Sequence, residues 1–394
     1  MAVYLDNNAT TALDEKVLEA MLPYMGQVAG NPSSVHRFGR LQKDAIEQAR
    51  ESVAQLAGAR AEQVIFTSGG TESNNLLLNG FCRSLGKQAL DKQVAKQGTE
   101  ARIAISAIEH MSLLEPAQHA TLAVDKIAVD ETGYITSSAV TQVMTEQTSL
   151  LSVMSANNET GVIQDLPPLI ALAKENDCFF HTDASQAAGK IPLNFIDSGV
   201  HAMTISAHKL YGPVGVGALI VDKRLPLAKL QFGGSQEKNF RAGTENVPAI
   251  VGFAKAAEMA FSNLKERSAH VLRLRSALEE GLKNSSAVTV FAETANRLPN
   301  TVQFGVAGFS GETLLMQLDR KAIAVSSGSA CTSEKTEPSH VLKAMSIPDG
   351  LASSAIRVSF GKNNTMSDVE TFITALNDII EINRRSAVMM AASI

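Results

Sequence analysis

The sequence predicts an α/β fold, with a large domain built on a mostly parallel β-sheet covered by helices and a smaller α+β domain. Three observations carry this prediction. Short apolar runs that end in small or polar residues alternate with segments that have apolar residues at helical spacing. The apolar runs are continuous, as in strands that are buried on both faces of a parallel sheet. The length of 394 residues exceeds what one simple core usually holds.

The large domain is expected over residues 15–255. Its strands are predicted at five apolar runs, which cover 62–70, 101–110, 149–161, 178–189 and 202–210. Helical patterns separate some of these runs, most clearly at 41–58 and 166–178. This alternation predicts a sheet that has helices on both faces.

The small domain is expected to combine residues 1–14 with 256–394, because the composition changes near residue 255. A tail at 387–394 is expected to be weakly ordered. The elements predicted in this domain are one long amphipathic helix over 256–284, strands at 287–293 and 300–306, and helices at 310–322 and 367–385.

Composition and charge exclude several classes of protein. A formal net charge of −5 argues against a basic nucleic-acid-binding surface. No apolar run is long enough for a membrane span, and the N-terminus shows no signal peptide. Cys82, Cys178 and Cys331 are widely separated and form no CxxC pair, so reduced thiols in the cytoplasm are expected rather than disulfides or a zinc site. Cys178, which opens an apolar strand, is expected in the core.

Polar side chains follow the predicted strands at the points where the strands end. His110, Asn158, Asp183, Gln186 and Lys209 all occupy such positions. In open α/β sheets, ligands bind outside the carboxyl ends of the strands. Each residue alone has a structural explanation, such as a helix cap for an aspartate. Their shared position predicts that they line one crevice.

A phosphate-binding turn is predicted at TSGGTESNN (67–75), which follows a strand and opens a helix through a pair of glycines. The N–H groups and the dipole of a helix N-terminus favour an anion. The segment has neither the Walker nor the dinucleotide-binding spacing. Gly70 and Thr71, with Ser206 and His208 near the lysine, therefore suggest a cofactor with a single phosphate.

Lys209 is interpreted either as a surface residue or as a desolvated amine nucleophile. A phosphorylated aldehyde cofactor with a pyridine ring would use all of these groups. Asp183 would pair with the ring nitrogen, His110 would stack on the ring, and Gln186 and Asn158 would bind its phenolic oxygen.

An alternative hypothesis takes His181 and Asp183 as part of a non-haem iron triad, because their H-x-D spacing places both on one side of a strand. Such triads are typical of β-sandwich oxygenases rather than of an α/β alternation. The hypothesis also leaves Lys209 and the turn at Gly70 without a role.

Cys331 lies in SSGSACTS (326–333), a segment of small polar residues that cannot build a core. It is therefore interpreted as an exposed thiol on a mobile loop. The alternative is an incidental surface cysteine.

The sequence resembles the class I cysteine desulfurases, which are fold-type I pyridoxal 5′-phosphate enzymes, over nearly the whole chain. LDNNATT and RAGTENV are nearest to the nitrogenase-maturation branch. The motifs that carry the resemblance are YLDNNATT (4–11), GNPSSVHRFG (30–39), TSGGTESNN (67–75), ANNETG (156–161), HTDASQAAGK (181–190), SAHKLYGPVGVGAL (206–219), RAGTEN (241–246), SSGSACTS (326–333) and EPSHVL (337–342).

The resemblance implies a role for each candidate residue. Lys209 would be the Schiff-base lysine, His110 the ring-stacking acid/base and Asp183 the partner of the ring nitrogen. Asn158 and Arg357 would bind the substrate, and Arg357 would bind the carboxylate of the substrate. The phosphate would be held by Gly70, Thr71, Ser206 and His208, and by Thr244 of the neighbouring subunit in a homodimer.

The implied reaction converts L-cysteine to L-alanine and keeps the sulfur as a persulfide on Cys331. An exposed thiol on a long loop suits this task, because it can attack in the pocket and deliver at the surface. The implied partner is a sulfur acceptor or an iron–sulfur scaffold protein, on which Cys331 would be a transient cluster ligand; no resident metal is implied. Ala207, 235–240 and 334–336 depart from the usual pattern without removing a catalytic group. A selenocysteine lyase and a catalytically silent scaffold remain alternatives.

Overall fold

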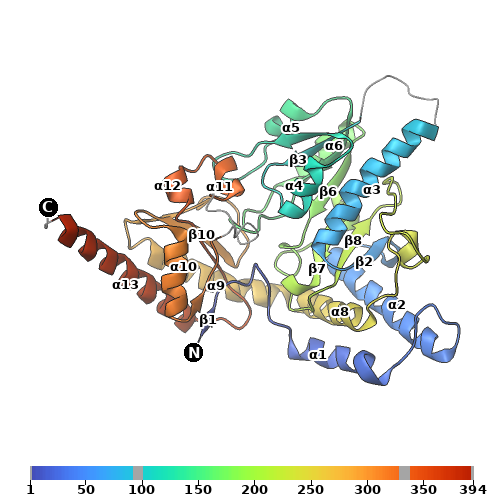
Figure 1. Ribbon diagram of the computed structural model, residues 1–394, viewed down its shortest axis with the longest axis horizontal. Coiled ribbons are helices and arrows are strands. Elements are labelled where there is room, and N and C mark those ends of the chain that lie inside the picture. Colours follow the sequence, from blue (N-terminus) through green and yellow to red (C-terminus); the bar gives the residue numbers. More distant parts are fainter. Residues whose placement is uncertain (1, 92–100, 328–337, 392–394) are drawn as a thin grey trace.

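The structure is a computed structural model that describes residues 2–91, 101–327 and 338–391. A larger α/β part and a smaller α+β part lie side by side (Figure 1). The fold class predicted from the sequence is therefore confirmed. Within the described ranges, no helix has both the length and the apolar character that a membrane span requires.

The larger part is built on a seven-stranded sheet with the spatial order β2-β8-β7-β6-β5-β3-β4. Neighbouring strands from β7 to β4 are parallel, whereas β8 runs antiparallel to both β2 and β7. The carboxyl ends of the parallel strands therefore meet at one edge. The strands are β2 (Val64–Thr67), β3 (Arg102–Ser106), β4 (Ala123–Ile127), β5 (Thr148–Ser152), β6 (Phe179–Asp183), β7 (Ala202–Ser206) and β8 (Gly217–Val221).

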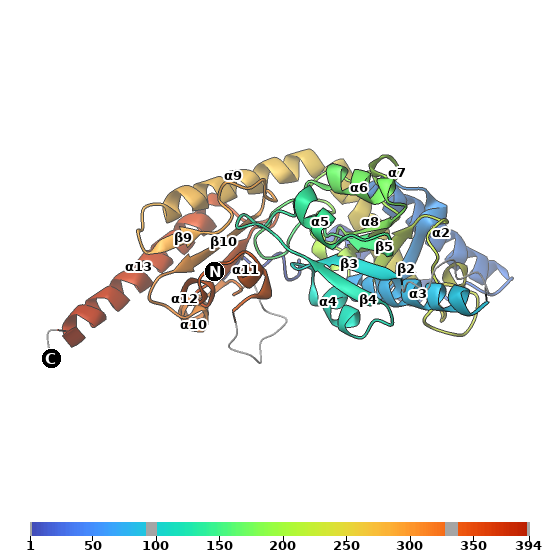
Figure 2. The same cartoon turned by 90° about the horizontal axis from the view of Figure 1, so that it is seen from above.

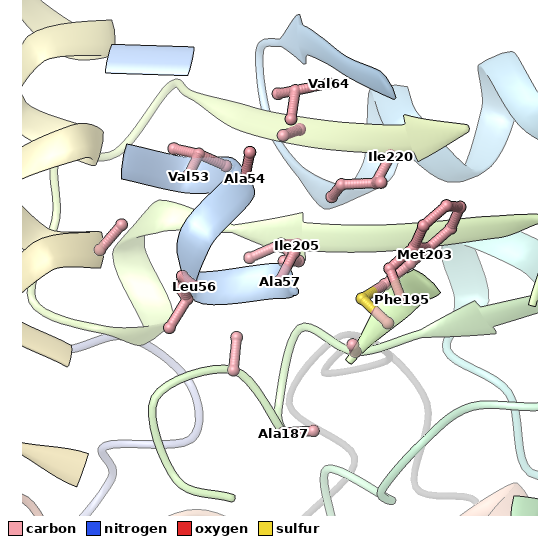
Figure 3. Close-up of a cluster of buried hydrophobic side chains, with 14 of the residues drawn as sticks. Val53, Ala54, Leu56, Ala57, Val64, Ala187, Phe195, Met203, Ile205 and Ile220 are labelled. Atoms are coloured by element: carbon pink, nitrogen blue, oxygen red, sulfur yellow. The ribbon is translucent and has the colours of Figure 1, made fainter. Parts of the chain in front are cut away.

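Helices cover both faces of this sheet (Figure 2). One face packs against α2, α6 and α8 in a single apolar cluster, and the other packs against α3 and α4. Figure 3 shows part of the first cluster, where Ala57 of α2 lies next to Ile205 of the sheet. The helices are α1 (Glu15–Leu22), α2 (Arg37–Ala57), α3 (Gly70–Asp91), α4 (Met111–Gln118), α5 (Ser137–Val143), α6 (Leu166–Glu175), α7 (Phe195–Ser198) and α8 (Val247–Ser262).

Helix α2 illustrates how local sequence sets these boundaries. His36 caps its N-terminus, where Nδ1 accepts the Gly39 N–H at 3.2 Å. Gly58 ends it in the left-handed conformation, with φ of 62°. A side chain at Gly58 would also collide with the backbone, because an added Cβ would lie 2.7 Å from the Asn194 Cα. The glycine is therefore required both by conformation and by packing.

The smaller part contains a three-stranded antiparallel sheet and a two-stranded parallel pair. The N-terminal strand belongs here, since Val3 pairs with Ile323 and the buried Leu5 joins the second apolar cluster. The elements are β1 (Val3–Tyr4), α9 (Leu264–Leu282), β9 (Val288–Val290), β10 (Thr301–Val306), α10 (Gly311–Arg320), β11 (Ile323–Ala324), α11 (His340–Ala344), α12 (Asp349–Ala352), β12 (Ile356–Ser359) and α13 (Met366–Ala391).

One expectation from the sequence is wrong. The single helix expected over 256–284 is two helices, separated at Asn263. The separation follows from packing, because the apolar residues of α8 belong to the first cluster and those of α9 to the second. Of the tail expected to be weakly ordered at 387–394, residues 387–391 belong to helix α13, and residues 392–394 lie outside the described residues. The expected domain boundary at 255 falls inside α8, and we place the division at Asn263.

A buried ion pair anchors the segment that follows the sheet. The guanidinium of Arg50 donates to both carboxylate oxygens of Glu237, at 2.8 and 2.9 Å. Glu237 also accepts the Phe66 N–H at 2.7 Å. Residues 237–239 all have positive φ, which non-glycine residues adopt only where other contacts enforce it. The ion pair supplies such a contact.

Replacement of Glu237 by glutamine should lower the free energy of unfolding by about 3 kcal/mol, because the buried guanidinium of Arg50 loses its buried counter-charge and keeps only the exposed carboxylate of Glu47. Urea denaturation followed by circular dichroism measures the change. Glu62→Gln is the matched control, since Glu62 and its partner Arg60 are both exposed and the change should be negligible. Equal denaturation midpoints for the two variants would contradict the anchoring role.

Candidate active site

One cavity of about 300 Å³ opens at the carboxyl ends of the parallel strands and is also lined by Arg357 of the smaller part of the chain. It brings together ten of the candidate residues. Asn8, Ala9, Ser112, Met154, Ala156 and Ser185 also line it. The candidates that line it are Gly70, Thr71, His110, Asn158, Asp183, Gln186, Ser206, His208, Lys209 and Arg357.

Asp183 is the last residue of β6, and its carboxylate is held on both oxygens. Oδ1 accepts the Ser185 N–H at 2.9 Å, and Oδ2 accepts from the Asn74 side chain at 2.8 Å. Asn74 is fully buried on α3 and also donates to the Ser112 hydroxyl at 2.8 Å. The carboxylate is thus fixed in the cavity wall, where it can pair with a cationic group of a ligand.

His110 lies four residues beyond the end of β3 and caps α4, rather than ending the strand itself. Its Nδ1 accepts the Ser112 N–H at 3.1 Å, so the proton of the neutral ring is assigned to Nε2. Burial lowers the pKa of His110, opposed by the charge of Asp183. The ring is therefore neutral near pH 7 and carries an Nε2 proton that it can exchange.

An anion cradle forms where α3 begins. The first N–H groups of a helix have no intrahelical acceptor, and α3 begins at Gly70. A Cβ at Gly70 would lie 3.2 Å from the Ser185 hydroxyl, which is buried and has no hydrogen-bond partner among the described residues. Burial, and then the charge of Lys209, lowers the pKa of His208 to about 4, so this ring is a neutral neighbour. An acceptor-rich group such as a phosphate would satisfy the unpaired donors.

Lys209 follows β7 on a short 3₁₀ turn, Ala207–Lys209. Its ammonium donates to the carbonyl oxygens of Asn8 and Ala9, at 2.6 and 2.8 Å. The N-terminal segment, more than 190 residues away in sequence, therefore holds the lysine at the cavity. No local sequence signal marks Asn8 as a site residue, although it lies within the motif YLDNNATT.

Arg357 reaches the same cavity from β12 of the smaller part. It donates to Asp6 Oδ1 at 2.7 Å and to the Asn158 carbonyl at 3.1 Å. Its Nε is buried without a partner among the described residues. A buried guanidinium with a remaining donor suits a carboxylate ligand.

Two candidates do not line the cavity in this chain. Thr244 lies in a separate groove with Tyr24, Met25 and Glu245. Cys331 lies outside the described residues.

The described residues on either side of this segment contact residues that line the cavity or are adjacent in sequence to ones that do. Before it, Ser326 exchanges two backbone hydrogen bonds with Arg357, at 3.2 and 2.6 Å. After it, Ser339 donates to the buried Glu159 carboxylate at 2.5 Å. The His340 imidazole lies 3.0 Å from the carbonyl oxygen of Glu109, which directly precedes His110. The described residues that flank 328–337 therefore lie beside candidate site residues.

The iron-triad hypothesis is wrong for the described residues. Both ring nitrogens of His181 contact hydroxyl groups, Nδ1 that of Ser152 at 2.9 Å and Nε2 that of Thr204 at 3.2 Å. Among the described residues, no group of three His, Cys, Asp or Glu side chains could hold a metal ion.

The buried cysteines have no reactive environment. Cys82 and Cys178 are each 3% exposed, and Cys178 lies in the core as predicted. Burial raises the pKa of both thiols, that of Cys178 to about 12. Neither thiol forms the thiolate readily near pH 7.

Comparison with known proteins gives a consistent result. The family model described as aminotransferase class-V matches residues 3–372. A protein named cysteine desulfurase IscS, from Dictyoglomus turgidum, is 42% identical over 96% of this chain and 94% of its own length. A solved structure named NifS-like protein superposes with a TM-score of 0.89 at 34% identity, covering 97% of this chain and all of the other. The structure of SspA in complex with cysteine gives a TM-score of 0.78 at 29% identity, over 92% of this chain and all of the other.

The family predicted from the motifs is thus confirmed by matches that extend along nearly the whole chain. These matches include all ten candidate residues that line the cavity, since each lies within residues 3–372. The chain belongs to the class V aminotransferase family and, within that family, to the cysteine desulfurases.

Proposed function

We propose that the cavity binds pyridoxal 5′-phosphate and that the protein converts L-cysteine to L-alanine, with the sulfur captured as a persulfide on Cys331. The observation that carries the proposal is the composition of one cavity of about 300 Å³. An amine, a fixed carboxylate, a helix N-terminus and a buried guanidinium all face it. The relatives named cysteine desulfurase support the choice of reaction.

The cavity residues fit the parts of this cofactor. The N-terminus of α3 and the unpartnered Ser185 hydroxyl would hold the phosphate, with Thr71 and Ser206 nearby. Asp183 would accept from the protonated ring nitrogen. Gln186 and Asn158 would face the phenolic oxygen, and His110 would lie against the ring.

When bound, pyridoxal 5′-phosphate withdraws electrons from the α-carbon of an attached amino acid. Lys209 Nζ would bind the aldehyde carbon in the resting protein and would move the proton at the substrate α-carbon. His110 would hold a second exchangeable proton on Nε2, near the substrate thiol. Arg357 would orient the substrate by binding the substrate carboxylate, because the Nε of Arg357 lacks any other acceptor among the described residues.

The thiolate of Cys331 would attack the substrate sulfur. A sulfur–sulfur bond forms as the bond between the substrate sulfur and Cβ breaks. The electron pair of the broken bond remains with the carbon, which takes up a proton and becomes the methyl group of alanine. The persulfide would then pass to an acceptor protein, such as an iron–sulfur scaffold, on which Cys331 would be a transient cluster ligand.

In the proposed function the protein acts as a homodimer, in which Thr244 of each subunit reaches the phosphate site of the other. Two observations support this arrangement. Thr244 lies in a groove away from the cavity of its own chain. Large apolar side chains are exposed in this groove, at Met25 (63%), and a short distance further along the chain, at Val35 (88%) and Phe38 (59%). Such a surface is typical of an interface between subunits.

Replacement of Lys209 by alanine should abolish covalent attachment of the cofactor, because no other lysine among the described residues lines the cavity. Borohydride reduction followed by peptide mass spectrometry locates the attached group. Lys174→Ala, at an exposed position on α6, should keep attachment at Lys209. Cofactor reduced onto a different lysine in the Lys209→Ala protein would refute the assignment.

Replacement of Asp183 by alanine should slow removal of the α-proton by at least about 100-fold, because the ring nitrogen loses a charged hydrogen-bond partner. Exchange of the α-hydrogen with deuterated solvent measures this step separately from turnover. The phosphate should remain bound, since the cradle at Gly70 is unchanged. Asp165→Ala removes an exposed carboxylate whose side chain makes no capping hydrogen bond, and it should exchange at the parental rate.

Replacement of Cys331 by serine should leave cofactor and L-cysteine binding intact and reduce alanine formation by about 1,000-fold, since a hydroxyl neither attacks sulfur well nor stores it. Labelled cysteine with non-reducing peptide mapping locates the sulfur. Cys178→Ala should form persulfide normally, because that thiol is buried. Alanine released by Cys331→Ser at near-parental rate would favour a lyase that eliminates sulfur directly.

A further inference from the structure

Asp6 is a carboxylate beside the active site to which the proposed reaction gives no role. Its Oδ1 accepts from Arg357 Nη2 at 2.7 Å, and among the described residues no other carboxylate forms an ion pair with Arg357. Arg357 lines the large cavity, whereas Asp6 does not. Any effect of Asp6 on a bound ligand therefore passes through the guanidinium.

The backbone places the two side chains on one face. Asp6 forms a parallel bridge with Ser359 of β12. Two backbone hydrogen bonds flank this bridge, from the Ser359 N–H to the Leu5 carbonyl at 2.7 Å and from the Asn7 N–H to the Ser359 carbonyl at 3.2 Å. Arg357 lies two residues before Ser359, and alternate residues of a strand point to the same face. The contact between Asp6 and Arg357 thus follows from the pairing of the N-terminal segment with β12.

The nitrogens of Arg357 divide between fixed acceptors and the cavity. The side chain is 3% exposed, so its N–H groups need acceptors within the protein or from a ligand. Asp6 accepts from Nη2, and the Asn158 carbonyl accepts from Nη1 at 3.1 Å. Nε is buried without a partner among the described residues. With two of its three nitrogens held, the plane of the guanidinium is set, and Nε remains for the carboxylate of a ligand.

Asp6 can act on such a ligand in two opposite ways. Its negative charge competes with a ligand carboxylate for the guanidinium, which weakens binding. Its hydrogen bond fixes the direction of Nε, which strengthens binding because the arginine loses less rotational freedom when the ligand arrives. The two effects can be separated, because an asparagine at position 6 keeps an acceptor oxygen and carries no charge.

We infer that Asp6 is a positioning residue, whose hydrogen bond holds the guanidinium of Arg357 with Nε directed to the carboxylate of the substrate. The inference deepens the proposed function and rests on it, because it concerns recognition of the amino-acid substrate. It assigns to Asp6 an effect on ligands that carry a carboxylate and none on amines that lack one.

The test compares Asp6→Asn with Asp6→Ala, both without the charge, in protein loaded with pyridoxal 5′-phosphate. L-alanine and ethylamine, which is alanine without its carboxylate, are titrated separately, and the visible absorbance of the cofactor reports binding of the amine. L-alanine should bind about 10-fold more weakly to Asp6→Ala than to Asp6→Asn, because only the asparagine keeps the acceptor that orients Arg357. Ethylamine should bind the two variants equally.

The matched control is Asp125→Ala, which breaks the Arg102–Asp125 ion pair of 2.6 Å at β3 and β4, away from the cavity. It should leave the affinity for both amines at the parental value. Asp6→Leu serves in place of Asp6→Ala if the alanine variant does not fold, since leucine is close to asparagine in size and has no acceptor.

Equal affinities for L-alanine in Asp6→Asn and in the variant without an acceptor would overturn the inference and leave the proposed function intact. A loss of ethylamine affinity as large as that of L-alanine would overturn it as well, because it would show general damage to the cavity. If the parental protein attaches no cofactor at Lys209, the proposed function and the inference are both refuted.

Discussion

The active site depends on one buried asparagine at the junction of the two parts of the chain. Asn8 is 1% exposed, so each of its polar groups needs a partner. Its side chain donates to Thr301 Oγ1 at 2.9 Å and to the Asn158 carbonyl at 3.2 Å, and its carbonyl accepts from Gln186 and Lys209. The residue thus contacts both parts at once. A shift between the parts would break hydrogen bonds on one side of Asn8. These hydrogen bonds therefore keep the Lys209 amine and the Arg357 guanidinium in one cavity.

The groups that the structure leaves unsatisfied are as informative as those it satisfies. The Ser185 hydroxyl and Arg357 Nε are buried at the cavity without partners among the described residues. A buried donor without an acceptor costs about 1–3 kcal/mol. Both donors lie where the proposed function places an anion, the phosphate in one case and the substrate carboxylate in the other. Their cost in the free protein is consistent with stabilisation by ligands at these two points.

The sequence predicted the part of the site that follows from sheet topology. Parallel strands end at one edge, so Asp183 and Lys209 could be placed together from their positions alone. Asn8 and Ser185 were missed because their roles come from contacts between segments that are distant in sequence. The break at Asn263 was missed for a related reason. The apolar pattern marks α8 and α9 as helical but does not tell which core each helix enters.

The pairing of the N-terminal segment with residues of the smaller part has a consequence for biosynthesis. Val3 pairs with Ile323, the backbone of Asp6 bridges to Ser359, and Asn8 contacts Thr301. All strands of the large sheet are complete by Val221, so that sheet can form while the chain is still being synthesised. The N-terminal segment, although made first, must wait for its partners until residues 301–359 have been synthesised. The contacts of Asn8 and Ala9 with the Lys209 ammonium can therefore be locked in place only after the smaller part of the chain has been made.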